Sequence, residues 1–535
     1  MRNHLNPVSP SSPPQTAHPL THKARTALTA CLILSLATGT RPTFANPAPN
    51  STTPIAQSTC AANLSQQIDQ AIDRPEYQRS QWGILAQTIG SRPQTLYARN
   101  AERFLVPASN VKLLTTAAAL TQLGADFRIR TSVYLERTTP EGAVLRVVGR
   151  GDPSLTNEQL QVLAQQIRDR GITRIASLIG DDRYFRGDAV NPSWEWEDIQ
   201  AGYGAPINSL ILNQNAIGLT LVPQQTGEPL GVTWDQPSEA QGWQIVNRSQ
   251  TVAADAPEFV SVGRDLGQPI LTVAGQLRVG SASEPVAVSI PQPGQNFLQQ
   301  FAETLRTAGV PVDRTQLITD GNLTDGNPDR GSQFATPAEI AAVDSPPLGE
   351  LLIETNRFSN NLHAEALLRS LGINFRENSR ENSEANRVDE SESALAAGIR
   401  VLKETLARLG VNPDGYELAD GSGLSRRNWV SPAAIVETLQ AMTRTTNALP
   451  YRTSLSVAGI SGTLQNRFRD TTVQGQLQGK TGALTGTAAL SGYLNRGDRP
   501  PIAFSIIVNQ ANTPPGEIRQ TIDGIVMLLQ GESCR

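Results

Sequence analysis

The stretch SNVKLLTTAAALTQLG, residues 109–124, combines a helical pattern with a reactive pair of side chains. Its apolar residues recur at helical spacing, and Gly124 is a typical stop signal. A helix that begins near Ser109 brings Ser109 and Lys112 to one face, because residues i and i+3 are neighbours there. An amine in that position can take the serine proton and create a nucleophile. The pair alone is also compatible with a helix cap followed by an exposed lysine.

Two further short motifs follow along the chain. Ser359-Asn360-Asn361 offers a hydroxyl and an amide that could relay a proton and hold a substrate amide, although Ser and Asn also favour helix N-caps. Lys480-Thr481-Gly482 opens a predicted strand, where a cation and a hydroxyl suit a substrate carboxylate. Glycine at that point lets a ligand backbone approach closely. An ordinary turn into a strand is the alternative for this third motif.

Composition excludes several function classes. The 535 residues include only three Cys and four His, and of these His only His363 lies away from the N-terminus. Zinc sites made of Cys and His are thereby disfavoured, and no metal or organic cofactor is expected. The net charge of −4 also argues against nucleic acid as a partner. Lysine occurs only at positions 23, 112, 403 and 480, so two of the three lysines beyond the N-terminal segment fall in the motifs.

The N-terminus indicates export. Residues 1–45 contain no acid, and Lys23 and Arg25 precede an apolar run that is shorter than the roughly 20 residues needed to span a bilayer. We expect a cleaved signal peptide over 1–45, a flexible tether over 46–59, no transmembrane anchor after cleavage, and a periplasmic or cell-envelope location. Cys60 and Cys534 then remain, and two cysteines near the ends of an exported chain predict a disulfide, with two free thiols as the alternative.

The rest of the chain divides by texture. Helical patterns lie at both ends, and residues 131–335 are dominated by short β-type runs between Gly and Pro turns. This arrangement predicts a split α/β domain, with a first part over 60–130 and a second part over 336–535, interrupted by inserted β-rich domains with a nested module at about 223–285. The polar run 376–393 is expected to be a solvated loop. GKTGALTGTAALSGYLN (479–495) and PIAFSIIVNQ (501–510) are typical of antiparallel strands.

Together the three motifs are far more specific than any one of them, because Ser-x-x-Lys, Ser-x-Asn and Lys-Thr-Gly in this order are shared by β-lactamases and penicillin-binding proteins. The sequence resembles the class C low-molecular-mass penicillin-binding proteins, which are D-alanyl-D-alanine carboxypeptidases and endopeptidases. Further stretches carry the resemblance: VVGRGDPSLT (147–156), GDDRYF (180–185), WEWED (194–198), YGAPINSLILNQN (203–215) and DGSGLSRRNWVSP (420–432). Soluble β-lactamases lack an insertion of roughly 250 residues between the first two motifs.

The resemblance implies a serine penicillin-recognising, transpeptidase-like fold, an antiparallel sheet flanked by helices. It implies a Ser109 acyl-enzyme, with Lys112 as base. Ser359 and Asn361 would relay protons and bind substrate. Lys480 and Thr481 would hold the terminal carboxylate, and Gly482 would let the substrate backbone approach.

The oxyanion hole would be the backbone N–H groups of Ser109 and Ala483, and Asp181, Phe185 and Arg426 would adjoin the pocket for the peptide's third residue. Ala483 replaces a common serine, and Asn360 a common Asp. The expected partners are peptidoglycan stem peptides, with β-lactams as covalent inhibitors. A β-lactamase-like hydrolase and a non-catalytic peptidoglycan-binding protein are the rival functions.

Overall fold

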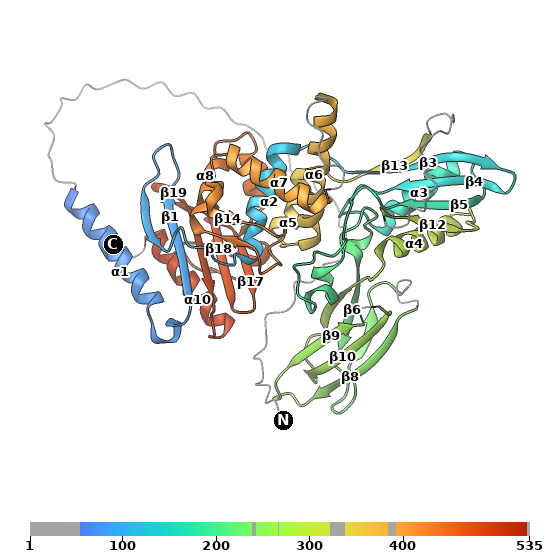
Figure 1. Ribbon diagram of the computed structural model, residues 1–535. Coiled ribbons are helices and arrows are strands. Elements are labelled where there is room, and N and C mark those ends of the chain that lie inside the picture. Colours follow the sequence, from blue (N-terminus) through green and yellow to red (C-terminus); the bar gives the residue numbers. More distant parts are fainter. Residues whose placement is uncertain (1–53, 238–241, 266, 321–336, 383–391, 532–535) are drawn as a thin grey trace, which may run out of the picture.

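The computed structural model describes residues 54–237, 242–265, 267–320, 337–382 and 392–531 (Figure 1). The predicted signal peptide lies outside these residues. So does Cys534, and with it the predicted bond to Cys60. Within the described part of the chain, none of the helices combines the length and apolar character needed to cross a membrane.

A six-stranded antiparallel sheet organises the part of the chain that carries the three motifs. Its strands, from one edge to the other, are β16 (Ser456–Val457), β17 (Leu477–Leu484), β18 (Thr487–Arg496), β19 (Arg499–Asn509), β1 (Gln81–Thr88) and β2 (Thr95–Arg99). The run from Ile502 to Asn509 in β19 is buried throughout, as expected for a strand covered on both faces. The N-terminal and C-terminal parts of the chain therefore meet in one sheet.

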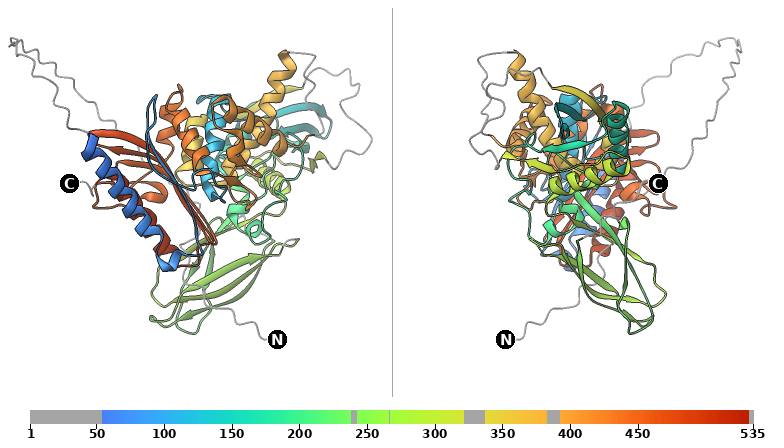
Figure 2. Two further views of the ribbon diagram at one scale, coloured as in Figure 1. Left: turned by 60° about the vertical axis from the view of Figure 1, so that its left-hand side comes forward. Right: turned by 90° about the vertical axis from the view of Figure 1, so that its right-hand side faces the viewer.

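Helices cover both faces of this sheet (Figure 2). On one face lie α1 (Pro54–Ile72) and α10 (Pro515–Gln530), whose apolar side chains join one core with the strands. The opposite face packs against a second core, to which α2 (Val111–Leu123), α5 (Leu348–Asn356), α6 (Asn361–Asn382), α7 (Ala394–Arg408), α8 (Pro432–Met442) and α9 (Ala448–Thr453) contribute.

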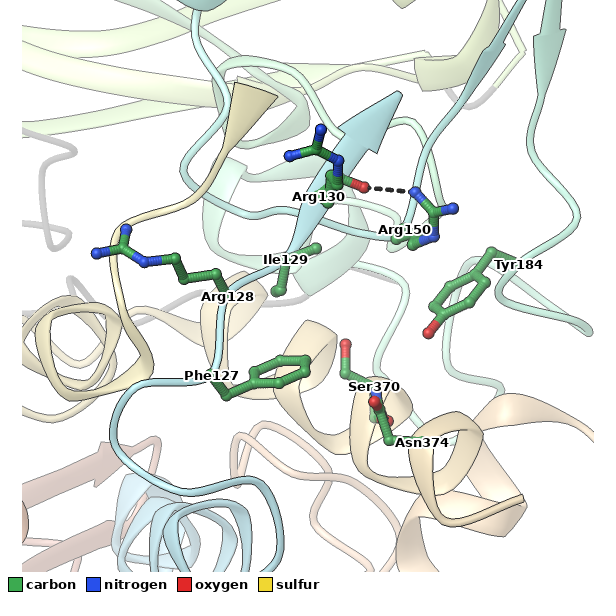
Figure 3. A pocket seen from close by; sticks show the side chains of 8 residues that line it. All are labelled: Phe127, Arg128, Ile129, Arg130, Arg150, Tyr184, Ser370 and Asn374. Atoms are coloured by element: carbon green, nitrogen blue, oxygen red, sulfur yellow. Dashed lines mark hydrogen bonds between the residues drawn. The ribbon is translucent and has the colours of Figure 1, made fainter. Parts of the chain in front are cut away.

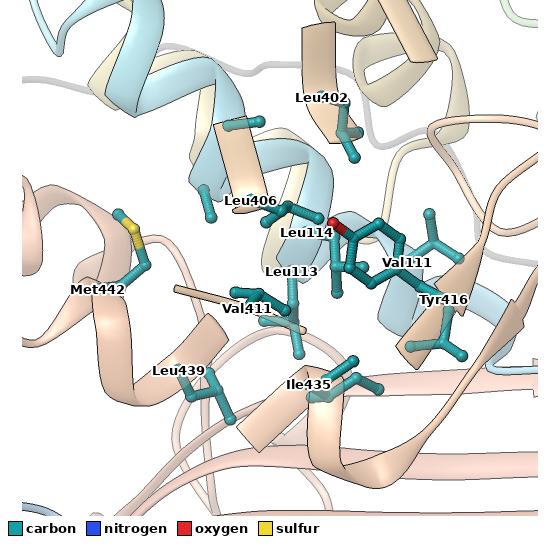
Figure 4. Packing of buried hydrophobic residues seen from close by; sticks show 14 of the residues in the cluster. Val111, Leu113, Leu114, Leu402, Leu406, Val411, Tyr416, Ile435, Leu439 and Met442 are labelled. Carbon is teal, nitrogen blue, oxygen red and sulfur yellow. The ribbon is translucent and has the colours of Figure 1, made fainter. Parts of the chain in front are cut away.

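The second core fixes the helix that carries Lys112. Val111, Leu113 and Leu114 of α2 are fully buried against α7 and α8, where Leu406 and Leu439 are also inaccessible to solvent (Figure 4). Burial of such a side chain stabilises the fold by about 1.5–3 kcal/mol. Every residue from Val111 to Leu120 is buried, including its polar ones, so the helix lies inside the domain. Lys112 is thus held by a rigid element.

The insertion begins with a second sheet. Its order is β12 (Thr315–Ile318), β5 (Ile175–Asp181), β4 (Gly142–Val148), β3 (Arg130–Thr139) and β13 (Ala338–Asp344), and it packs with α3 (Asn157–Asp169) and α4 (Pro293–Thr307). β13 pairs antiparallel with β3, so the chain returns to the first sheet's domain near Ser345. The boundary expected at 335/336 therefore falls before this strand, because the strand pairing could not be seen in the sequence.

A third unit consists of two three-stranded sheets. One contains β11 (Glu284–Ser289), β6 (Ala216–Val222) and β7 (Gly231–Trp234), and the other contains β8 (Gln244–Val252), β10 (Ile270–Arg278) and β9 (Phe259–Arg264). They share a core that includes Ile217 and Val288. The module thus spans about 216–290, wider than the expected 223–285, and it projects from the rest of the molecule (Figure 2).

Three local expectations need correction. α1 begins at Pro54, so residues 54–59 of the expected tether are helical; proline is favoured at the first position of a helix. α6 continues to Asn382, into the segment expected to be a loop from 376, because extending a formed helix costs far less than nucleating one. Residues 479–495 hold two strands, separated at Gly486, whose φ of +73° suits the turn between β17 and β18. A short pair, β14 (Tyr416–Glu417) and β15 (Trp429–Val430), completes the strands.

Candidate active site

The turn before α2 fixes the position of Ser109. Ala108 has a positive φ of 48°, and the Cβ of any residue replacing Gly423 would lie 1.9 Å from its carbonyl oxygen. The side chain of Asn110 is buried below the turn and donates to Ser491 Oγ at 2.7 Å. Loop and sheet together hold the turn in a conformation that an isolated chain would rarely adopt.

Lys112 lies directly below Ser109, as the i, i+3 spacing predicts. Its Nζ donates to Ser109 Oγ at 3.1 Å, to Asn361 Oδ1 at 2.6 Å and to the Ser422 carbonyl at 2.6 Å. The side chain is completely buried. Burial lowers the pKa of Lys112 to about 7, against the opposing effect of the Asp420 and Glu365 carboxylates. An amine with such a pKa is substantially neutral at physiological pH.

The second motif lies between α5 and α6. Ser359 has a positive φ of 63°, a conformation that costs of order 1–3 kcal/mol at a non-glycine residue and that clusters at functional sites. Asn360 caps α6 by accepting the His363 N–H at 3.1 Å, so the helix-cap interpretation of this motif holds for its middle residue. Asn361 instead bonds Lys112, and its Nδ2 donates to the Tyr203 carbonyl at 3.0 Å.

The insertion therefore reaches the second motif twice. Besides the Tyr203 carbonyl, Gln214 Oε1 accepts from Asn360 Nδ2 at 2.7 Å. Gln214 is the middle of three consecutive residues in the left-handed region, Asn213 to Asn215. Asn215 holds this turn by donating to Asn208 and Pro206. The insertion orients the amide of Asn361 so that its oxygen faces Lys112.

The third motif completes the cluster. Lys480 Nζ donates to Ser359 Oγ at 2.7 Å and to the Thr481 carbonyl at 2.8 Å. Lys480 is completely buried; burial, and then the charge of Lys112, hold its pKa well below the ordinary lysine range. The Thr481 hydroxyl donates to Thr463 Oγ1 at 2.8 Å. The motifs thus supply two hydrogen-bonded groups of side chains, Lys112 with Ser109 and Asn361, and Lys480 with Ser359.

β17 runs past Ser109 with its outer edge open. β16 pairs only with Gln478 and Gly479, and among the described residues no strand pairs with the edge beyond them. A side chain at Gly482 would meet the Pro107 carbonyl at 2.7 Å, so glycine permits the close approach of β17 to the nucleophile turn. Ala483 follows on this strand and is exposed. An extended peptide can add to such an edge by backbone hydrogen bonds.

Known proteins are similar to this chain in both sequence and architecture. Residues 64–529 match the D-Ala-D-Ala carboxypeptidase 3 (S13) family. A D-alanyl-D-alanine carboxypeptidase from an Actinomadura species is 32% identical over 467 residues, which cover 84% of this chain and 82% of that protein. The chain belongs to this family. It is a class C low-molecular-mass penicillin-binding protein and a serine-type D-Ala-D-Ala carboxypeptidase.

Two more comparisons extend this result. The penicillin-sensitive carboxypeptidase A of Dictyostelium discoideum is 27% identical over 481 residues, which cover 84% of this chain and 87% of that protein. The crystal structure of penicillin binding protein 4 from Haemophilus influenzae superimposes with a TM-score of 0.71 at 21% identity, covering 88% of this chain and 99% of that chain. The expected fold class, a transpeptidase-like domain with inserted β-rich domains, is confirmed.

The three outlying residues predicted for this family member differ in their surroundings. Phe185 is buried in a cluster with Leu424, close to the loop that contacts Lys112. Arg426 pairs with Glu195 at 2.7 Å and donates to the Thr485 carbonyl just after β17. The Asp181 carboxylate is bound by Arg183 at 2.7 Å and by Arg146 at 3.2 Å. The ion pairs of Asp181 lie wholly within the insertion, whereas that of Arg426 joins the second part of the split domain to the insertion.

Several residues at the site escaped the sequence analysis. Glu365 and Asp420 are buried carboxylates beside Lys112, Thr463 holds Thr481, and Gln214 contacts Asn360. The Gly-rich stretch 420–423 is the one visible signal, since it marks a close backbone approach. The cavity drawn in Figure 3 is separate from this site. It has a volume of about 170 Å³, and its lining residues are Phe127, Arg128, Ile129, Arg130, Arg150, Tyr184, Ser370 and Asn374.

Proposed function

We propose that this carboxypeptidase acts on peptidoglycan stem peptides through an acyl-enzyme on Ser109. The observation that carries the proposal is the contact of 3.1 Å between Nζ of the fully buried Lys112 and Oγ of the partly exposed Ser109. A buried amine with a pKa of about 7 is a suitable base for a serine hydroxyl, because a general base works best when its pKa is near the operating pH.

Acylation then follows from the geometry. Neutral Lys112 takes the proton as Ser109 Oγ attacks the carbonyl carbon of the penultimate D-Ala. The N–H groups of Ser109 and Ala483 are proposed to receive the developing oxyanion, where donors that need no reorganisation are worth most. The substrate backbone would lie along the open edge of β17, and its terminal carboxylate would meet Lys480 and Thr481.

The leaving amine needs a proton. Ser359 Oγ accepts from Lys480 at 2.7 Å, and Asn361 accepts from Lys112 at 2.6 Å, so the second motif lies between both amines. We assign to Ser359 the relay of the proton that Lys112 took from Ser109 to the D-Ala nitrogen, so that the C–N bond breaks, D-Ala is released and Lys112 is neutral again. Water then attacks the acyl-enzyme and restores Ser109. Phe185 and Arg426 are proposed to line the pocket for the third residue of the peptide.

Export and the wider substrate range belong to the same proposal. We also propose that residues 1–45 are a signal peptide, that the enzyme is located in the periplasm or cell envelope, and that Cys60 and Cys534 form a disulfide. The same acylation chemistry would also cleave a cross-link in which the leaving group is a D-amino-acid centre of a second stem peptide. Release of D-Ala from a pentapeptide, measured beside cleavage of a cross-linked muropeptide, separates carboxypeptidase from endopeptidase activity.

Labelling with fluorescent penicillin tests the nucleophile. Ser109→Ala is expected to abolish the covalent adduct, since among the described residues Ser109 supplies the hydroxyl that bonds Lys112 Nζ, whose other partners are an amide oxygen and a backbone carbonyl. Ser393→Ala is the control, because Ser393 is a helix-capping serine of α7 and is expected to leave labelling intact. Mass spectrometry of the labelled peptide identifies the modified residue. Labelling that survives Ser109→Ala contradicts the assignment, and rapid release of hydrolysed penicillin indicates β-lactamase behaviour instead.

A further inference from the structure

Glu365 is a buried carboxylate that the acylation steps leave unused. It lies on α6, four residues after Asn361, so both side chains project from the same face of the helix. Its exposed fraction is 0%. A fully buried carboxylate is rare unless it is paired and hydrogen-bonded, and the partners of Glu365 show what it supports.

The carboxylate holds the loop that contacts Lys112. Glu365 Oε1 accepts the Gly421 N–H at 2.8 Å and the Ser422 N–H at 2.9 Å. The carbonyl of the same Ser422 accepts from Lys112 Nζ at 2.6 Å. A single residue, Ser422, therefore links the Glu365 carboxylate to a carbonyl that accepts from Lys112. From the other side, Thr115 of α2 donates to the Gly421 carbonyl at 2.7 Å.

The charges around Glu365 are few and are all buried. Arg369, one turn further along α6, donates to Glu365 Oε2 at 3.1 Å and is 1% exposed. Asp420 lies in the loop and accepts the Gly423 and Ser425 N–H groups at 2.7 and 2.6 Å. Lys112 faces the pair from α2, and Lys480 lies beyond Lys112. Burial, and then the neighbouring Asp420 carboxylate, raise the pKa of Glu365, whereas Arg369 and the two backbone donors favour its ionised form.

We propose that Glu365 is a positioning residue of the acylation reaction, one that fixes the Ser422 carbonyl against the amine of Lys112. The proposal rests on the function proposed above, because it assigns a role to a residue behind the Lys112 base. The carboxylate acts in two ways. It sets the place of a hydrogen-bond acceptor for the amine, and its charge favours the ammonium form of Lys112.

The geometry and the charge have separable consequences. Loss of the two backbone contacts misplaces the Ser422 carbonyl and lowers the acylation rate where Lys112 is fully neutral. Loss of the charge favours the neutral amine, so the acid limb of the pH–rate profile moves to lower pH. A carboxylate that only held the loop for folding would lower stability without moving that limb.

The test compares Glu365→Gln with Glu365→Asp in the full chain. Because Glu365→Gln alone leaves the Arg369 charge buried without a partner, the double variant with Arg369→Met serves as a second, charge-balanced form. Glu437→Gln is the matched control. Glu437 lies on α8, is half-buried and accepts the Asn412 N–H at 2.8 Å, but it has no contact with Lys112. The second-order rate constant for acylation by fluorescent penicillin is measured from pH 5 to 9, with melting temperatures as the folding check.

We expect Glu365→Gln, alone or with Arg369→Met, to move the acid limb to lower pH, because the amide oxygen can still accept the two N–H groups while the charge is gone. Glu365→Asp, which is shorter by one methylene group, is expected to lower the plateau rate about tenfold or more while the limb stays in place. A folded neutral variant with the parental limb, or a folded Glu365→Asp variant with the parental plateau, overturns the proposal. If penicillin does not label Ser109 in the parent enzyme, the proposed function is overturned instead. Failure of the proposed function can therefore be told apart from failure of the proposal about Glu365.

Discussion

Lys112 and Lys480 have the same burial and different surroundings. Both amines are inaccessible to solvent, and each bonds one serine hydroxyl of the site. Lys112 also has two further acceptors, and burial lowers its pKa to about 7 against the opposing effect of two nearby carboxylates. Among the residues that the structure describes, no carboxylate contacts Lys480, and burial holds its pKa well below the ordinary lysine range. Lys403, by contrast, is a partly exposed lysine paired with Glu417 at 2.6 Å.

The difference indicates how two chemically identical side chains acquire different roles. Fixed anions behind Lys112 keep its amine close to the point of half protonation, which suits a base that must both take and return a proton. Lys480 has no anionic partner in the described part of the chain, so an anion that stabilises its ammonium form could come with the substrate. This difference supports the proposed role of Lys480 in binding the terminal carboxylate.

The largest effect is expected from Lys112→Met. Removal of a general base typically costs 10²–10⁴-fold in rate, so penicillin acylation is expected to fall by about that factor while binding of the intact drug is retained. Stopped-flow measurement of adduct formation gives the rate. An acylation rate within threefold of the parent would show that Lys112 is not the base.

The same variant gives a stability test with a defined sign. The pKa of Lys112 in the folded chain, about 7, lies below the ordinary lysine value of 10.5, so the unfolded chain binds more protons between these two pH values. The stability of the parent therefore rises with pH in this window. Relative to the parent, Lys112→Met is expected to have its greatest advantage in unfolding free energy at pH 7 and below, and to lose it toward pH 10. Denaturant titrations at several pH values measure the difference.

Lys480 is expected to show an effect of intermediate size. In the empty site burial favours its neutral amine, and a bound carboxylate favours the ammonium form, so substrate binding should take up a proton. Calorimetry of an N-acylated D-Ala-D-Ala peptide with Ser109→Ala, in two buffers of different ionisation enthalpy, measures this uptake.

Lys480→Met in the same background is expected to abolish the uptake. It should also weaken peptide binding by about 10–100-fold, the value of a hydrogen bond to a charged group. A peptide that lacks the terminal carboxylate is the ligand control. Proton uptake that persists without Lys480 would assign it to another group.

The smallest effect concerns the insertion. Gln214→Ala removes the hydrogen bond of 2.7 Å to Asn360 but leaves the motif itself intact, so acylation is expected to slow only about two- to tenfold, the value of one ordinary hydrogen bond. Gln236→Ala is the control, because Gln236 is an exposed glutamine of the same insertion that contacts Asn157. Equal rates for both variants would show that this contact does not support the second motif.

The motif residues that meet at the candidate site could be singled out from the sequence because they are close together in the chain or of a rare type. Ser109 and Lys112 are three residues apart, and scarcity of lysine made Lys480 conspicuous. The place of Glu365 at the site could not be predicted, since it depends on a contact with Ser422, 57 positions away in the chain. A buried glutamate on a helix looks like a surface glutamate until the fold is known.

The end of the insertion and the end of α6 differ from the sequence-based expectation for a similar reason. The return strand β13 belongs to the insertion because it pairs with β3, more than 190 positions earlier. The polar composition of residues 376–382 predicted a loop, yet α6 continues through them. Local propensity was overridden in both cases, by strand pairing in the first and by continuation of an existing helix in the second.

The pairing of β3 with β13 also bears on how such an enzyme could arise. The chain leaves the peptidase domain and returns to it through two neighbouring antiparallel strands, with Arg130 opposite Asp344 and bound to it at 3.0 Å. Entry and exit points this close can be joined by a short turn. In evolutionary terms, a single deletion could remove the insertion and leave the two parts of the peptidase domain joined by a short turn. An ancestor without it would have needed another acceptor for the amide of Asn361, which now depends on the Tyr203 carbonyl.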